Sequence, residues 1–208
     1  MRHNSHNTGY FLLFWLSGLL SGCIFVKGET EEREQQFEIS PKPEVRISEE
    51  LVRSRDGDMI AFLPENWFFI DAEKHAPADI FAVAVNEDYT LSAVFSELRH
   101  LDRATGAPTI DSPLSMARAS FEKRTKKTAG AVRQVGKFST IKIGPREFGA
   151  YEFSSAGGAL RNRTAVFRSS LGNYYEFSLV PLTVTGRPLP PDSSVQKIFR
   201  SILTTVQY

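Results

Sequence analysis

The side chains that most often carry acid–base or metal chemistry are rare in this chain. Two of its four histidines lie near the N-terminus, and only His75 and His100 fall in the region expected to fold. Neither has a second histidine three or four residues away, and Cys23 is the only cysteine, so the ligand spacing of a zinc site is missing. We interpret both histidines as solvated loop residues and expect no metal and no cofactor.

Three Ser-x-x-Lys pairs could supply a nucleophile and its base, but the sequence lacks their usual companions. It contains neither Ser-Asp-Asn nor Lys-Thr-Gly, and Gly-x-Ser-x-Gly is absent as well. Asp56-Gly57-Asp58 has too few oxygen ligands nearby for calcium and is typical of a turn. We assign no catalytic residue and expect a protein that is not an enzyme, with a ligand-binding hydrolase of scattered catalytic residues as the alternative. The three pairs are Ser120–Lys123, Ser139–Lys142 and Ser194–Lys197.

A short apolar run leads to the cysteine. Arg2 is the only charged residue before Lys27, and the run begins at Tyr10 and closes with Leu20-Ser21-Gly22-Cys23. A basic start, a short apolar core and small residues at its end form the layout of a secretory signal. A transmembrane helix needs about 20 apolar residues, and this run is shorter and interrupted by serine and glycine. We expect residues 1–22 to direct export.

The segment Leu20-Ser21-Gly22-Cys23 resembles the lipobox of bacterial lipoproteins, in which an apolar residue and two small residues precede the lipidated cysteine. The resemblance implies cleavage after Gly22, lipidation of Cys23 and attachment of the mature chain to a membrane. Ile24 is not the aspartate that commonly retains such proteins at the inner membrane. In a two-membrane bacterium this implies the outer membrane, facing the periplasm. An uncleaved signal anchor, or ordinary cleavage with Cys23 as a bystander, remains the alternative.

The mature chain is expected to be neutral overall, and its first segment, residues 23–50, is acidic. Without residues 1–22, the 25 basic residues fall to 24 against 24 acids, a balance that does not favour nucleic acid as a partner. Residues 23–50 are acidic and poor in apolar side chains, and Pro41 and Pro43 break any helix there. We interpret residues 23–50 as the lipidated cysteine followed by a flexible acidic tether. A short helix at residues 29–37, packed on the domain, is the alternative.

Residues 51–208 have the pattern of one folded domain. Turn signals such as Pro64-Glu65-Asn66 separate short apolar runs, as is typical of antiparallel strands. Apolar residues at helical spacing predict helices at residues 113–128, with Ser112 as N-cap, and at 193–206, capped by Asp192 or Ser193. We expect strands at residues 59–63, 67–70, 79–85, 90–98, 135–143, 147–154, 160–169 and 174–182.

The sheet of this domain should be covered on both faces. Residues 80–85 are apolar at every position, whereas a strand with one wet face should alternate. The odd-numbered residues of this run should face one helical layer and the even-numbered residues the other, all of them buried. The domain is therefore predicted to be an α+β three-layer sandwich, an antiparallel sheet of about seven strands with helices on both faces.

Three segments resemble the PsbP-like superfamily. They are the turn Leu63-Pro64-Glu65-Asn66-Trp67, the strand Tyr174-Tyr175-Glu176-Phe177 and the closing helix Ile198-Phe199-Arg200-Ser201-Ile202. The order of elements over residues 51–208 is similar too. The superfamily includes the extrinsic PsbP subunit of photosystem II, a nuclear Ran-binding factor and bacterial envelope lipoproteins. Its turn usually has glycine before the tryptophan, and Asn66 can also adopt positive φ. The resemblance implies this fold and a non-enzymatic role.

Positive charge is concentrated in and after the predicted helix at residues 113–128. Seven basic residues lie between positions 118 and 137, against Glu122 alone. Lys123, Lys126 and Lys127 should point away from the apolar stripe of the helix, which makes them candidates for partner binding. A solvated helix face is the plain alternative. A binding face would suit anionic lipid headgroups or an acidic partner, and the acidic tether could also fold back onto it.

These observations predict an envelope lipoprotein that acts as a non-catalytic binding or adaptor module. Its partners would be the membrane, through the lipid on Cys23, and an unidentified envelope protein.

Overall fold

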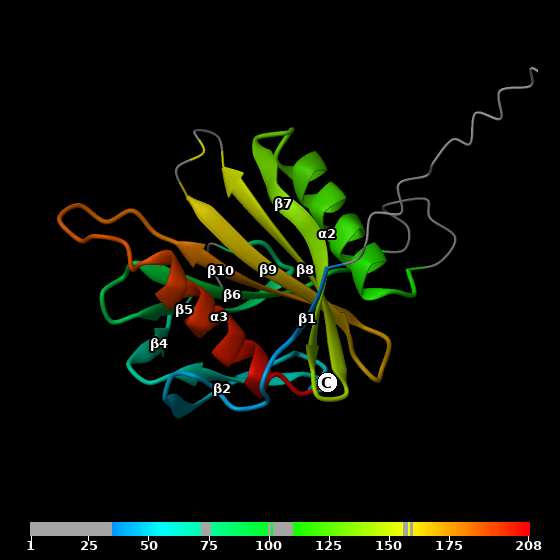
Figure 1. The fold of residues 1–208 in the computed structure, drawn as a ribbon, viewed down its shortest axis with the longest axis horizontal. Helices are drawn as coiled ribbons and strands as arrows, with labels where there is room; N and C mark the ends of the chain where they lie inside the picture. The colour runs from blue at the N-terminus through cyan, green and yellow to red at the C-terminus, as the bar shows by residue number, and fades with distance from the viewer. Residues whose placement is uncertain (1–34, 72–75, 100, 102–109, 156–157, 159) are drawn as a thin grey trace, which may run out of the picture. The chain divides into compact units, whose positions relative to one another are not determined.

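The computed structural model describes residues 35–71, 76–99, 101, 110–155, 158 and 160–208. They form a mixed α+β fold with a large, mostly antiparallel sheet and two long helices (Figure 1). The large sheet has eight strands in the order β1-β7-β8-β9-β10-β6-β5-β4, and β2 and β3 form a separate two-stranded sheet. The strands of the large sheet are β1 (Gln35–Glu38), β4 (Trp67–Phe69), β5 (Ile80–Asn86), β6 (Leu91–Glu97), β7 (Val132–Ile143), β8 (Arg146–Ser155), β9 (Arg161–Arg168) and β10 (Tyr174–Pro181).

Tight turns produce the antiparallel part of the sheet, as the sequence predicts. Gly144, with φ of +57°, joins β7 to β8, and Asn66, with φ of +63°, precedes β4. Both positions need the left-handed region that glycine and asparagine tolerate best. The seven predicted strands that enter the large sheet are confirmed within a few residues. Trp67 lies on the edge strand β4 and is buried.

The N-terminal boundary of the domain is wrong in the sequence-based prediction. Strand β1 pairs in parallel with β7, and β2 (Ile47–Arg53) pairs with β3 (Ile60–Pro64). Ile39 is buried in the main core. The flexible tether therefore does not extend to residue 50, and the alternative helix at residues 29–37 is not formed at Gln35–Glu38. The polar, acidic composition hid strands that are held by sheet pairing with little burial of their own side chains.

Two helices accompany the sheet. Helix α2 (Pro113–Lys127) begins at a capping box in which Ser112 accepts a hydrogen bond from the Ser115 backbone and the Ser115 side chain accepts one in return. This confirms the predicted N-cap. Helix α3 (Asp192–Thr205) starts after Pro191 without a side-chain cap. Asp192 lies in its first turn and pairs with Arg163, and the predicted cap by Asp192 or Ser193 is wrong.

The helices contribute to two separate apolar clusters. In the larger cluster, the ring of Phe199 on α3 stacks on Phe177 of β10, with the centroids 5.3 Å apart. The smaller cluster contains Ala117 of α2 together with Tyr151 of β8 and Val166 of β9. Since successive side chains of a strand point to opposite faces, it is notable that Val166 joins the smaller cluster while both of its neighbours on β9 join the larger one.

Strand β5 departs from the predicted alternation. Its pairing with β6 shifts between Ile80 and Ala82, which is the signature of a β-bulge. Phe81 consequently packs with the larger cluster, as Ala82 does, and its ring lies 5.9 Å from that of Tyr175. Only Ala84 and Val85 of this run are buried, so the expectation that all six residues are buried was wrong.

Candidate functional site

Helix α2 lies unusually close to the sheet at its N-terminal end. Gly149 of β8 makes this approach possible, because a Cβ built at that position would lie 1.8 Å from the carbonyl oxygen of Pro113. The last turn of the helix carries Arg124, Lys126 and Lys127, whose charges suit the negative end of the helix dipole. The predicted basic face is therefore held by a helix with a fixed start and a closely packed body.

The three lysines predicted to bind a partner lie in different surroundings. The Lys123 ammonium donates to the carbonyl oxygen of Arg99 at 3.0 Å. The Lys127 ammonium lies 3.3 Å from the carboxylate of Asp79, in a solvent-exposed ion pair. Lys126 is exposed. All three remain accessible in part, and Lys123 and Lys127 contact neighbouring elements.

Lys123 and Lys127 stand beside a cavity of about 280 Å³ next to α2. Lys126 does not line it. The opposite wall is apolar and comes from β5, β6 and β10, with Val94 and Val180 among its residues. Ser96 and Ser178 add hydroxyl groups, and Glu176 and Arg124 lie at the base. Two of the three predicted lysines, Lys123 and Lys127, therefore line a cavity that the sequence did not indicate.

A buried polar network lies at the base of this cavity. The carboxylate of Glu176, on β10, pairs with the guanidinium of Arg124 and accepts hydrogen bonds from Ser120 and Tyr151. The same guanidinium reaches the Ser178 hydroxyl at 3.3 Å and lies over the ring of Phe153, 4.5 Å from its centroid. Among the described residues, no buried side-chain polar atom lacks a hydrogen-bond partner. A fully satisfied network of this kind fixes the helix on the sheet.

The protonation states in this network are firmly set. Burial alone would lower the pKa of Arg124, but the charge of Glu176 outweighs it and raises that pKa above the ordinary value. Burial, together with the charge of Glu176, raises the pKa of Tyr151 well above its usual range. Arginine therefore stays charged and tyrosine stays protonated at any physiological pH, and neither group is poised to exchange protons.

Two of the three Ser-x-x-Lys pairs are not arranged as catalytic dyads. Ser120 contacts Glu176 and Tyr151, while Lys123 points to the Arg99 carbonyl. Ser139 and Lys142 lie three residues apart on β7, and successive residues of a strand alternate between faces. His75 and His100 lie outside the described residues, as does Cys23. Within the described part of the chain, no cluster of three or more potential metal ligands occurs.

Sequence reasoning missed the buried network, although one signal for it was available. Glu176 is a carboxylate inside an otherwise apolar and aromatic strand, and such residues are rarely buried unless they are paired. Ser120 and Arg124 are four residues apart on α2, so they face the same side of the helix. The pairing itself joins positions 52 residues apart in the chain and could not be read from local spacing.

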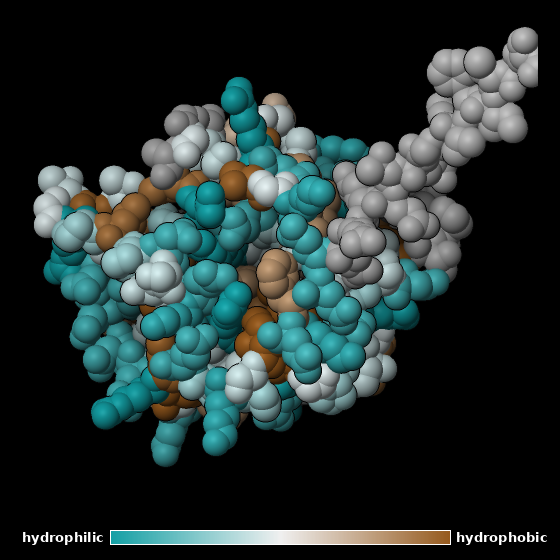
Figure 2. Space-filling model, viewed as in Figure 1, coloured by the Kyte–Doolittle hydropathy of each residue, from teal (hydrophilic) through white to brown (hydrophobic). Residues whose placement is uncertain are grey.

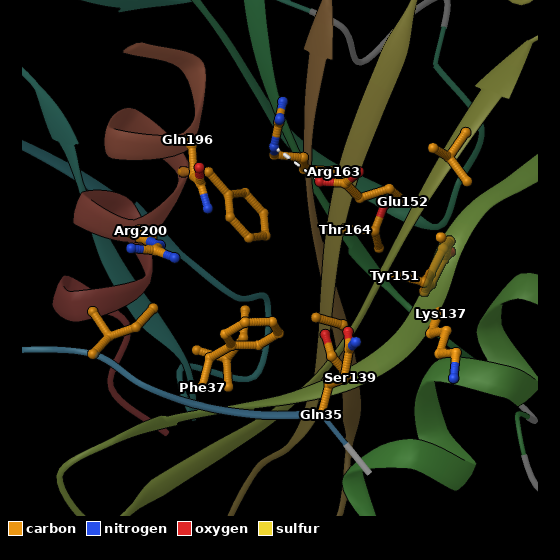
Figure 3. A pocket seen from close by; sticks show the side chains of 16 residues that line it. Gln35, Phe37, Lys137, Ser139, Tyr151, Glu152, Arg163, Thr164, Gln196 and Arg200 are labelled. Carbon is orange, nitrogen blue, oxygen red and sulfur yellow. Dashed lines mark ion pairs between the residues drawn. The ribbon is translucent and has the colours of Figure 1, made fainter. Parts of the chain in front are cut away.

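A second hollow, of about 240 Å³, lies between α3 and strand β1 (Figure 3). Its lining includes Phe37 of β1, Ser139 of β7, Thr164 of β9, and Gln196 and Arg200 of α3. None of these residues was singled out in the sequence for binding. Among the helices of the described residues, none is long and apolar enough to cross a membrane.

Comparison with solved structures shows which known fold this protein resembles. No family model matches the sequence, and no curated protein matches it. The structure is similar to that of the cyanobacterial PsbP protein (CyanoP) from Synechocystis sp. PCC 6803, with a TM-score of 0.51 and 14% identity over 76% of this chain and 92% of that one. Two further solved structures are more distant in TM-score. They are the Ran-binding protein Mog1p of Saccharomyces cerevisiae (0.48, 16% identity, 77% and 95% covered) and LpqN of Mycobacterium tuberculosis (0.43, 14% identity, 77% and 90% covered).

The described residues therefore have the PsbP-like fold, which confirms the resemblance inferred from three sequence segments. At 14% identity the likeness concerns the fold alone, and it does not transfer a partner or an activity from one protein to another.

Proposed function

We propose that this protein is a lipid-anchored, non-catalytic binding module of the bacterial envelope, and that the basic face of α2 binds an acidic segment of a partner protein. The observation that carries the proposal is the pair Lys123 and Lys127 beside an open cavity. The carboxylate at the base of that cavity, Glu176, is already neutralised by Arg124. Lys127 is paired with Asp79, which also lines the cavity, so Lys123 leaves one net positive charge at its mouth. This charge attracts acidic groups.

The proposal includes a layered architecture. We place α2 and α3 on opposite faces of the large sheet, because alternate residues of β9 and β10 contribute to the contacts of different helices. Glu176 contacts α2, whereas its neighbour Phe177 stacks on Phe199 of α3. In a three-layer module of this kind, the sheet separates the basic face of α2 from the surface around α3.

The anchor is the second part of the proposal. Leu20-Ser21-Gly22-Cys23 supplies the lipidation motif, and the described domain begins about a dozen residues later, at β1. Such a length of chain spans at most about 40 Å even when it is fully extended. The basic face of α2 would then work close to the membrane, and in a two-membrane bacterium it would do so on the periplasmic face of the outer membrane.

Crosslinking of the lipidated chain in its own membranes tests the binding surface. A photoreactive benzoylphenylalanine replaces Glu122, which is exposed on α2 beside the three lysines. We expect a protein adduct that weakens at high salt and is lost when Lys123, Lys126 and Lys127 are all changed to glutamate. Thermal stability should change by less than about 1 kcal/mol, because exposed charges contribute little.

The matched control reverses three exposed cations elsewhere, Lys42, Arg46 and Lys197, and thereby makes the same change in net charge. This variant should keep the adduct. Crosslinking that is equal in the two triple variants, or that involves lipid alone, would contradict the proposed docking surface.

A further inference from the structure

The hollow between α3 and β1 is lined by residues of five elements, β1, β7, β8, β9 and α3, beside the larger apolar cluster. Phe199 of α3, Ile141 of β7 and Phe37 of β1 supply its apolar surface (Figure 3). Phe37 is 43% exposed, which is unusual for a phenylalanine beside a core. In the space-filling view, apolar surface is visible between hydrophilic groups in the region over α3 and β1 (Figure 2).

An irregularity in β7 shapes one wall of this hollow. The pairing of β7 with β8 shifts between Val135 and Ser139, and Gly136 within that stretch has φ of +71°. Bulges redirect side chains and are frequent next to binding sites. Lys137 and Ser139, at the end of this irregular stretch, line the hollow together with Ile141.

The polar groups of the hollow fall into two sets. Arg163 is buried and fully engaged, since its guanidinium lies 3.2 Å from the carboxylate of Glu152 and 2.6 Å from that of Asp192. By contrast, Arg200, Gln196 and Lys137 have no side-chain hydrogen bond or ion pair within the described part of the chain. Groups that serve only the fold are normally paired, as the network beneath α2 is.

Two of these side chains without partners among the described residues, Gln196 and Arg200, place a positive charge and an amide group next to each other. Gln196 and Arg200 are four residues apart on α3 and therefore lie on the same side of the helix. Arg200 also borders a smaller hollow that contains Glu38 and Glu44, yet no ion pair joins it to either carboxylate. A guanidinium and a neighbouring amide, open toward an apolar surface, can hold a carboxylate by paired hydrogen bonds.

We propose that this hollow binds a small carboxylic acid with an apolar body about the size of an aromatic ring. The apolar part lies against Phe37 and Phe199, and the carboxylate accepts hydrogen bonds from Arg200 and Gln196. The volume of about 240 Å³ is slightly below the range typical of drug-sized ligands, which limits the body to a single ring or a short branched chain. This site is separate from the basic face of α2, and the inference does not depend on the proposed function.

Calorimetric titration of the full chain, isolated from its own membranes into nanodiscs, tests the site, with empty nanodiscs as blank. The probe is 3-phenylpropionate, its uncharged amide is the neutral partner, and acetate is the partner without an apolar body. We expect millimolar or tighter binding for the probe only. Arg200→Gln should weaken it about tenfold, the loss expected for one hydrogen bond to a charged group. Phe37→Ser should weaken it as well.

Lys197→Gln provides the matched control, since it removes a positive charge from the exposed side of the same helix without touching the hollow. Binding should be unchanged in this variant. A diazirine-bearing analogue of the probe should label peptides from β1, β7 and α3. Equal binding of acid and amide, an Arg200→Gln variant that binds normally, or labelling confined to other segments would each overturn the inference.

Discussion

Asp58 shows how a single carboxylate can join distant turns. It accepts hydrogen bonds from Ser54, in its own turn, and from Ser169, Asn173 and Tyr175, more than 100 residues further along the chain. Burial by itself would raise the pKa of Asp58, but the four donors outweigh it and lower that pKa to about 2. The sequence indicated only an Asp-Gly-Asp turn at this point, and the structure makes the second aspartate of that turn a tie between β3 and the β9–β10 connection.

The lowered pKa of Asp58 predicts a defined acid sensitivity. The unfolded value is about 3.9, so the contribution of the carboxylate is complete above that pH and is lost as pH falls toward about 2. Asp58→Asn should cost about 1–3 kcal/mol at pH 7, because donors to a charged acceptor lose strength. The difference from wild type should shrink at pH 2 in urea unfolding followed by circular dichroism. Asp56→Asn, in the same turn, is the control. Asp56 accepts a single exposed hydrogen bond, from Asn173, so this variant should lose much less stability than Asp58→Asn, and an equal loss in both variants would refute the role of Asp58.

Gly149 of β8 sets the distance between helix α2 and the large sheet. A methyl group at this position would collide with backbone at the start of α2, and backbone cannot move aside as a flexible side chain can. Gly149→Ala should therefore cost about 3 kcal/mol, at the upper end of the usual cost of overpacking. Thermal unfolding measures the loss, and Ser155→Ala at the exposed end of β8 is the control. A Gly149→Ala variant as stable as the control would show that α2 can shift outward freely.

Helices and strands that are marked by a cap or a turn could be predicted from the sequence. The contacts between residues distant in sequence could not. Ser112 and the apolar spacing located α2, and the turns around Asn66 and Gly144 located the flanking strands. Strand β1 escaped because its four residues are all exposed, so its pairing with β7 leaves no pattern of burial. The bulge in β5 and the pairing of Arg124 with Glu176 depend on residues distant in sequence. The two lysines could be chosen by charge, while the cavity beside them could not.

At the scale of the whole molecule, the proposed anchor would limit which partners are accessible. Strand β1 is at one edge of the sheet and is the first described element after Cys23. A lipid on Cys23 would keep the domain within about 40 Å of the bilayer, the reach of a dozen extended residues. Partners of the basic face would then be proteins of the same membrane or of its immediate surroundings, which is where crosslinking should find them.

The anchor itself leads to the last prediction. The proposed lipidation would attach acyl chains to Cys23. Each buried CH₂ contributes about 0.8 kcal/mol, and two or more chains are enough for stable attachment. Cys23→Ser should abolish lipidation and cleavage and leave a precursor held by its uncut signal, whereas Ser21→Ala keeps a small residue before the cysteine and should be processed normally. Mass spectrometry of the N-terminal peptide measures both outcomes. A chain that begins with unmodified Cys23, or that is cut at another position, would remove the lipid anchor and with it the envelope location proposed for the domain.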